Sequence, residues 1–248
     1  MWNNPHRLNV LAGLLAATAL LALFFAGVQW LLRSPLFPLH EITVKGRLAH
    51  TARADVERAT QGRVRGNFFA VDLAEVRAAL EALPWVRGVG VRRAWPDRLE
   101  VTIEEHEPLA HWGVDALVNT FGERFAARSN ARLPRLDGPE GTASEVAQRF
   151  LRFGDILAPL GLKVERMELT PRFAWRLTLD SGLHIELGRD VGEQPAELRL
   201  ARFAAAYPQT LAKVQQQHAY VDLRYPNGFA LRVPGIERAP DEDPGAKS

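Results

Sequence analysis

The feature that most constrains this chain is an uncharged stretch near its N-terminus, Leu8–Leu32, which lies between Arg7 and Arg33. A helix rises about 1.5 Å per residue, so the stretch would extend for roughly 37 Å, longer than the hydrocarbon core of a bilayer, about 30 Å. A cleaved signal peptide has a shorter apolar region of about 7–15 residues and small residues at its cleavage site. Because the residues after Ala26-Gly27 make a poor cleavage site, we predict an uncleaved transmembrane helix over residues 8–32.

The charges that flank this helix leave its orientation open. One arginine precedes the span and one follows it, and Lys/Arg bias sets the orientation only when the two sides differ. The short polar segment before the span, residues 1–7, favours a cytoplasmic N-terminus. The sequence has no cysteine, which excludes a disulfide framework and a thiol nucleophile but suits either compartment.

The rest of the chain has the composition of globular domains. Charged residues make up 24% and hydrophobic residues 47% of the sequence, which is enough for a packed core. The formal net charge is only +2, and no Lys/Arg cluster interleaves with aromatic residues, so nucleic-acid binding is not indicated. Residues 235–248 are rich in polar residues, proline and glycine, and we expect a disordered tail there.

The segment after the span, residues 37–108, has the pattern strand, helix, helix, strand, strand. Residues 42–44 alternate between apolar and polar side chains until Gly46, which predicts a short strand. Thr51 and Asp72 are placed to be the N-caps of two helices.

The second of these helices has apolar residues at spacings of three and four, which form one stripe. The stripe consists of Leu73, Val76, Leu80 and Leu83. Two alternating runs follow, Val86–Trp95 and Leu99–Glu105, joined by a turn at Pro96-Asp97. Two helices on one face of a three-stranded sheet would bury the stripe.

A second block, residues 109–234, is predicted to be a mainly β domain of mixed α+β content. Its expected strands are His111–Leu117, Asn119–Phe125 (around a turn near Phe121-Gly122), Val164–Leu169, Trp175–Leu179, His184–Leu187, Tyr220–Tyr225 and Phe229–Val233. Asn227-Gly228 lies between the last two runs, and this dipeptide is typical of a tight two-residue hairpin.

Two helices are expected within the second block. Thr142 and Glu145 have the spacing of a capping box and open a helix towards Leu160. Pro195 opens a further helix, which Pro208 ends.

No catalytic constellation is present in the sequence. The nucleophile-elbow, zinc-protease, phosphate-loop and dinucleotide motifs are absent. The densest acidic cluster, Glu104–Glu107, would suit a metal only if its side chains shared a face, and on a strand they alternate; a solvated strand edge is the simpler interpretation. His218 and Asp222 would lie about 13 Å apart on a strand, too far for a catalytic pair. We therefore predict no enzymatic activity, no cofactor, no metal site and no small-molecule substrate.

Short motifs recur in order from the first block to near the C-terminus. They are Leu83-Pro84-Trp85-Val86, Val91-Arg92-Arg93, Trp95-Pro96-Asp97, Glu107-Pro108-Leu109-Ala110-His111-Trp112, Gly138-Pro139-Glu140-Gly141, Leu187-Gly188-Arg189 and Tyr220-Val221-Asp222-Leu223-Arg224-Tyr225. In this combination the chain resembles the FtsQ/DivIB family of bacterial cell-division proteins, in its Gram-negative form. The N-terminal segment of about seven residues is shorter than in many members, so functions assigned to a longer cytoplasmic tail are not carried over.

The resemblance implies an α+β fold in which one transmembrane helix precedes a POTRA domain (37–108) and a β domain (109–234). It implies a single-pass inner-membrane protein at the division septum, with the N-terminus in the cytoplasm and both domains in the periplasm. It also implies a scaffold without catalytic activity, which links early and late division proteins and controls septal peptidoglycan synthesis. The expected partners are the small division proteins FtsB and FtsL.

The last predicted strand is expected to be a sheet edge that pairs with a partner strand. The resemblance implies that FtsB-like partners bind there, and the matching positions are Arg224, Tyr225, Asn227, Gly228, Phe229, Ala230 and Leu231, together with Arg172 in front of the Trp175 strand. In the alternative, Tyr225 and Phe229 belong to the core and the helix near Leu198 covers the edge.

The first block offers a further alternative for partner binding. Its strand from Val86 to Arg93 could be a second binding edge, with Arg87, Arg92 and Arg93 either contacting a partner or simply solvated. A different class of function would be a POTRA-type periplasmic chaperone or secretion adaptor. The single POTRA-like unit and the N-terminal anchor favour the division protein.

Overall fold

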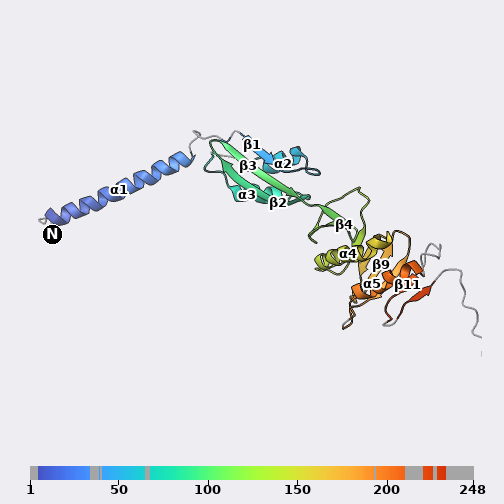
Figure 1. The fold of residues 1–248 in the computed structure, drawn as a ribbon. Helices are drawn as coiled ribbons and strands as arrows, with labels where there is room; N and C mark the ends of the chain where they lie inside the picture. Colours follow the sequence, from blue (N-terminus) through green and yellow to red (C-terminus); the bar gives the residue numbers. More distant parts are fainter. Residues whose placement is uncertain are drawn as a thin grey trace, which may run out of the picture. The chain divides into compact units, whose positions relative to one another are not determined.

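The computed structural model describes residues 5–33, 39, 41–64, 68–192, 194–209, 220–225 and 228–232, and the chain divides into two compact units (Figure 1). Unit 1 comprises Met1–His106 and unit 2 Glu107–Ser248. Each unit has a sheet and a hydrophobic core of its own.

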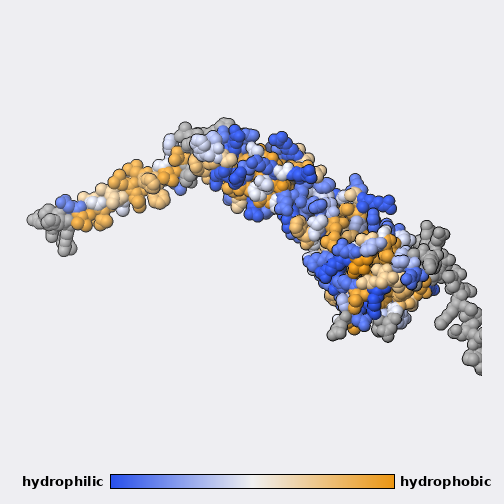
Figure 2. All heavy atoms as spheres, in the orientation of Figure 1, coloured by the Kyte–Doolittle hydropathy of each residue, from blue (hydrophilic) through white to orange (hydrophobic). Residues whose placement is uncertain are grey.

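Unit 1 begins with a long helix, α1 (Pro5–Arg33), within which Leu8–Leu31 is long and apolar enough to span a membrane. None of the span's most apolar window is buried against the rest of the protein, and Figure 2 shows an almost continuous hydrophobic surface along it. An apolar helix that is not buried against the described part of its chain suits a lipid environment, in which every backbone group is satisfied within the helix.

The remainder of unit 1 has the predicted order of elements. It consists of β1 (Glu41–Lys45), α2 (Arg53–Thr60), α3 (Leu73–Glu81), β2 (Val86–Ala94) and β3 (Arg98–Glu105). The sheet order is β1-β3-β2, in which β1 is parallel and β2 antiparallel to β3. This arrangement confirms the strand, helix, helix, strand, strand pattern of a POTRA domain.

The core of this domain is the predicted apolar stripe packed against the sheet. Val76 and Leu80 of α3 are fully buried with Leu99 and Val101 of β3, and the other two stripe residues pack at the margin. Asp72 is the N-cap of α3, as predicted, because its Oδ1 accepts hydrogen bonds from the backbone N–H of Ala74 and Glu75 at 2.8 and 3.2 Å.

The prediction that Thr51 caps the first helix is wrong. Ala52 is the N-cap of α2 and makes no side-chain cap. The carboxylate of Glu105, at the end of β3, instead accepts hydrogen bonds from the backbone N–H of Ala49, His50 and Thr51 at 2.6–3.2 Å. A side chain remote in sequence thus satisfies the donors before the helix, which local patterns do not reveal.

The charged residues around β2 are engaged rather than simply solvated. Arg87 is half-buried and pairs with Glu104 at 2.6 Å, and Arg92 pairs with Glu100 at 2.8 Å. Arg93 donates to the carbonyls of Phe68, Phe69 and Val71 at 2.7–3.3 Å, so that it holds the segment before α3. Glu104 and Glu107 are exposed, as expected of a solvated strand edge, whereas Glu105 is half-buried and binds backbone N–H groups.

Unit 2 is built on one nine-stranded sheet. Its strands are β4 (Pro108–Trp112), β5 (Ala116–Asn119), β6 (Arg124–Phe125), β7 (Arg135–Asp137), β8 (Val164–Leu169), β9 (Trp175–Leu179), β10 (His184–Gly188), β11 (Tyr220–Asp222) and β12 (Ala230–Arg232). Its helices are α4 (Ala143–Leu157) and α5 (Ala196–Ala206), followed by the 3-10 turns Ala158–Leu160 and Tyr207–Gln209 respectively. The sheet order is β12-β11-β10-β9-β8-β7-β4-β5-β6.

The two faces of this sheet differ. Helix α4 packs against β7 and β8, and α5 packs against β10, so both helices cover one face. Phe153 and Phe203 are buried there with Trp175. Along β8–β10 the alternate residues are exposed or half-buried, so the other face of these strands is open to solvent.

Three details of unit 2 differ from the predictions. The run predicted as one strand from His111 to Leu117 is broken at Gly113, whose φ of +57° makes a turn between β4 and β5. Strand β7 lies in a segment predicted to be a loop. Thr142 is the N-cap of α4 by position, but its hydroxyl donates to the carbonyl of Pro139 at 2.7 Å, so the capping box does not form.

Candidate partner-binding site

Strand β12 lies at one end of the nine-stranded sheet as the structure describes it. It pairs only with β11, in the antiparallel register Tyr220↔Arg232, Val221↔Leu231 and Asp222↔Ala230. All three residues of β12 are exposed, among them the predicted site residues Ala230 and Leu231. The outer backbone groups of such a strand are available to a further strand.

The connection between β11 and β12 is longer than the predicted tight hairpin. β11 ends at Asp222 and β12 begins at Ala230. Strand pairing stops because the Oδ1 of Asp222 accepts a hydrogen bond from the backbone N–H of Arg224 at 3.0 Å, a local turn that competes with the ladder. Gly228 is exposed in this connection, and Asn227, also a predicted site residue, lies outside the described residues.

The two aromatic side chains of this connection have different environments. Tyr225 is 55% exposed. Phe229 is half-buried and packs edge-to-face on Phe203 of α5, with ring centroids 6.0 Å apart. The alternative in which both rings belong to the core is therefore wrong for Tyr225 and holds in part for Phe229.

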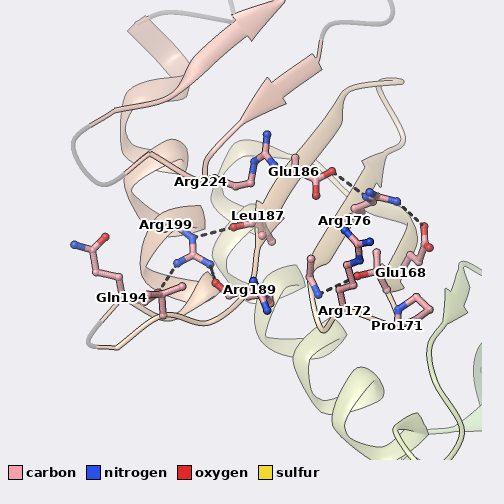
Figure 3. Close-up of a pocket in the computed structure, with 14 residues that line it drawn as sticks. Glu168, Pro171, Arg172, Arg176, Glu186, Leu187, Arg189, Gln194, Arg199 and Arg224 are labelled. Carbon is pink, nitrogen blue, oxygen red and sulfur yellow. Dashed lines mark hydrogen bonds and ion pairs between the residues drawn. The ribbon is translucent and has the colours of Figure 1, made fainter.

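Arg172 and Arg224, which are 52 residues apart in the sequence, border one pocket of about 1000 Å³ (Figure 3). Strand pairing explains the convergence: Trp175 opposes Gly188, and Glu186 opposes Asp222. The turn before β9 and the end of β11 therefore lie at the same end of the sheet. Arg172 comes from that turn, and Arg224 follows β11.

The pocket is cationic. Its charged lining residues are Arg172, Arg176, Arg189, Arg199 and Arg224, against Glu168 and Glu186. Arg176 is paired with Glu186 at 2.9 Å and with Glu168 at 3.9 Å. Within the described part of the chain, Arg172 and Arg189 are exposed and make no ion pair, so the site carries positive charge in excess.

Arg224 is held in place by its neighbour Asp222. Its Nε and Nη2 donate to the buried carboxylate at 2.5–3.0 Å, while its own side chain is more than half exposed. These hydrogen bonds raise the pKa of Arg224 and lower that of Asp222. The pair fixes a permanently charged guanidinium whose Nη1 lies outside the bidentate contact.

Gly188, at the end of β10, allows Arg224 to lie across the strand. Its φ is +73°, and a Cβ at this position would stand 2.8 Å from the Cγ of Arg224. A side chain here would both strain the backbone and displace the arginine.

Arg199, on α5, forms the floor of the pocket. It is 95% buried, and its guanidinium donates to the carbonyls of Leu187, Arg189 and Gln194 at 2.5–3.0 Å. Burial lowers the pKa of Arg199. It fixes the loop from β10 to α5 and adds to the positive potential.

The sequence indicated part of this site. The structure brings the predicted residues Arg172 and Arg224 to one pocket at the same end of the sheet, and Tyr225 follows Arg224 in the connection to β12. Gly188, Arg189 and Arg199 were missed as site residues, although the motif Leu187-Gly188-Arg189 pointed to the first two. Nothing local marks Arg199, because a buried arginine on an amphipathic helix looks like a surface residue in the sequence.

The geometry suits binding. An open strand edge, an exposed tyrosine and a cationic pocket together fit an extended polypeptide segment that carries a carboxylate. No group of three metal-ligating side chains occurs in the described segments of the chain.

An apolar N-terminal helix, a POTRA domain and a sheet-rich domain define a single-span membrane protein in which two domains follow the span. Residues 37–106 match the family described as "POTRA domain, FtsQ-type", and residues 110–224 match "Cell division protein FtsQ/DivIB, C-terminal". The chain belongs to the FtsQ/DivIB family of cell-division proteins.

Curated relatives support this assignment over the full length. The chain is 44% identical to the cell division protein FtsQ of Burkholderia pseudomallei, with both chains covered completely. It is 39% identical to FtsQ of Bordetella pertussis, over 94% of this chain and 93% of the relative. It is 33% identical to FtsQ of Neisseria gonorrhoeae, over 100% of this chain and 99% of the relative.

Proposed function

We propose that this protein is a non-catalytic scaffold of the division machinery in the inner membrane. It links early and late division proteins at the septum and controls septal peptidoglycan synthesis by binding FtsB/FtsL-type partners. The N-terminus lies in the cytoplasm, and the domains of residues 37–108 and 109–234 lie in the periplasm. The observations that carry this proposal are the open β12 edge and the cationic pocket, which Arg224 borders just after the neighbouring strand β11.

The partner adds a strand to β12. About three or four backbone hydrogen bonds would contribute roughly 0.5–1.5 kcal/mol each, whereas association costs about 4–15 kcal/mol. Backbone pairing alone is therefore marginal, and side chains must add to it. Tyr225 is the exposed aromatic residue closest in sequence to the edge, and aromatic side chains often dominate such interfaces.

The cationic pocket selects an acidic side chain of the partner. Arg172 and Arg224 border it from two elements, and Asp222 holds the guanidinium of Arg224 in place. An arginine whose position is fixed in advance loses little conformational entropy when it binds a carboxylate.

Replacing Tyr225 by Ala tests the contact. Because the ring is half exposed, the fold should be unchanged, and capture of an FtsB-type partner should weaken about 10–30-fold, the cost of losing an aromatic anchor. The measurement is a binding titration with the full-length chain in nanodiscs. The control is Phe121→Ala, which removes an aromatic ring of similar exposure from the turn between β5 and β6. Equal affinities for both variants would contradict the proposed contact.

Depletion of the protein in its own cells tests the cellular role. The scaffold proposal expects filaments without septa, which expression of the wild-type chain rescues. Normal division during depletion would show that the chain is not needed for septation.

A further inference from the structure

The turn between β2 and β3 exposes a large aromatic side chain. Trp95 is 82% exposed, although tryptophan side chains are highly buried on average. It lies outside both strands, immediately before Pro96-Asp97. Such a ring, apolar with one N–H group, suits the boundary between lipid and water.

The topology of the sheet ties this turn to the membrane. β1 and β3 are parallel, and Glu41 at the start of β1 is opposite Arg98 at the start of β3. The β2–β3 turn therefore lies at the end of the sheet where the chain enters from the span (Figure 1). The last residue of β3, Glu105, lies at the opposite end.

The connection to the span is short. Seven residues, 34–40, separate the end of α1 from β1. A chain advances at most about 3.6 Å per residue, so the start of β1 stays within roughly 29 Å of the end of α1. Of the two ends of the POTRA sheet, the one with Trp95 is thus the end to which the span connects.

A second exposed aromatic residue lies at the same end. Phe69 is 43% exposed, and its carbonyl oxygen accepts a hydrogen bond from Arg93, which stands two residues before Trp95. Arg98 lies 3.4 Å from Glu41 and 3.8 Å from Asp97, and Arg93 donates to backbone carbonyls. These arginines are engaged within the domain, so aromatic insertion carries the contact with the membrane.

We propose that Trp95 and Phe69 dock the POTRA domain on the outer surface of the membrane that α1 spans, with both rings in the headgroup region. The short connection keeps this end of the domain at a high effective concentration near the lipid, so two aromatic contacts suffice. The docked state restricts the orientation of the POTRA domain relative to the bilayer. This inference does not depend on the partner site of unit 2.

The absence of cysteine from the chain allows a direct test by site-specific labelling. A nitroxide label at Asp97→Cys in the full-length chain, reconstituted in phosphatidylcholine nanodiscs, should be more accessible to oxygen than to a water-soluble nickel complex. The same label at Val114→Cys, which is 95% exposed in unit 2, should show the reverse.

Removing the rings should release the domain. Trp95→Ser and Phe69→Ser together should return the Asp97→Cys label to the aqueous values of the Val114→Cys control. Trp95→Ser alone serves as the fold check. So exposed a ring contributes little to stability, so the thermal transition of this variant should match that of the wild type. An aqueous signal with both rings present, or a buried signal only when other membrane proteins are added, would overturn the proposal.

Discussion

Glu105 and Arg199, like Arg93, hold loops by binding backbone groups instead of opposite charges. Glu105 accepts three backbone N–H groups before α2, and Arg199 donates to three carbonyls between β10 and α5. Hydrogen bonds that involve a charged group are stronger than those between neutral groups. Each side chain therefore satisfies backbone groups in a segment that has no helix or strand to pair them.

Glu105 should make the POTRA domain sensitive to acid. Burial raises the pKa of its carboxyl group, but the hydrogen bonds from residues 49–51 together lower the pKa by more than burial raises it. The pKa of Glu105 therefore lies below its ordinary value. A depressed pKa in the folded state contributes stability that is complete above the unfolded value of about 4.3 and is lost as the pH falls through the folded value. We expect amide exchange of residues 49–51, corrected for intrinsic rates, to accelerate between about pH 5 and pH 3.

Glu105→Gln should exchange faster already at neutral pH and lose most of this pH dependence. The control is Glu104→Gln. It changes the neighbouring carboxyl group and removes only that group's ion pair with Arg87. If Glu105→Gln retained the acid response of the wild type, another carboxyl group would have to cause it.

Arg199 should be a stability residue of unit 2. In Arg199→Met the apolar stem is kept, but three backbone carbonyls lose their donors, and we expect the free energy of unfolding to fall by about 3 kcal/mol. Urea denaturation of the full-length chain would measure it. Arg172→Met should change stability by less than about 0.5 kcal/mol, because Arg172 is exposed and unpaired among the described residues. A loss as large in Arg172→Met would contradict this distinction.

At the scale of elements, the site depends on where β10 and β11 end. β10 finishes with Gly188 at positive φ, and β11 finishes with Asp222, whose side chain turns the chain so that Arg224 lies back over Gly188. The position of the cationic group thus follows from two strand ends rather than from a regular element.

Gly188→Ala tests this dependence. The added Cβ would stand 2.8 Å from the Cγ of Arg224, so the arginine must move and its contact with Asp222 must weaken. We expect partner binding to drop about 10-fold, as for the loss of one charge-assisted contact. Gly161→Ala is the matched control, because its φ is +69° and nothing lies within 4 Å of its Cβ. It carries the same backbone strain and should bind normally.

Elements with a strong period could be predicted from the sequence, and short ones could not. The alternation in Val164–Leu169 and Trp175–Leu179 and the apolar stripe of α3 placed those elements correctly. β7 was missed because its three residues, Arg135–Asp137, are too few to show a period; its parallel partners β4 and β8 supply the pattern.

The end of the chain shows a second kind of failure. Asn227-Gly228 favours a tight hairpin in isolation, yet the strands end at Asp222 and begin again at Ala230. One local and one tertiary contact decide this: Asp222 binds Arg224, and Phe229 packs on Phe203. The residues of the candidate site were largely predictable from family motifs, whereas Gly188 and Arg199 depend on contacts that only the fold creates.

For the whole molecule, the proposed scaffold gives the open edge and the anchor complementary roles. A strand edge of three residues offers little affinity in free solution. A helix that confines the chain to a membrane raises the effective concentration of any partner in the same membrane. The scaffold proposal therefore requires both features in one chain, and neither is sufficient alone.

The anchor prediction follows directly. A chain without residues 1–33 should bind a membrane-anchored FtsB-type partner about 100-fold more weakly than the full-length chain in the same vesicles, because tethering typically adds two or more orders of magnitude. Replacing α1 by an unrelated apolar helix of equal length should restore binding if confinement is its only contribution. If the unrelated helix fails to restore binding while it inserts normally, the side chains of α1 contact the partner themselves. Contacts between α1 and a helix of the partner, rather than confinement to the same membrane, would then compensate for the low affinity of the edge.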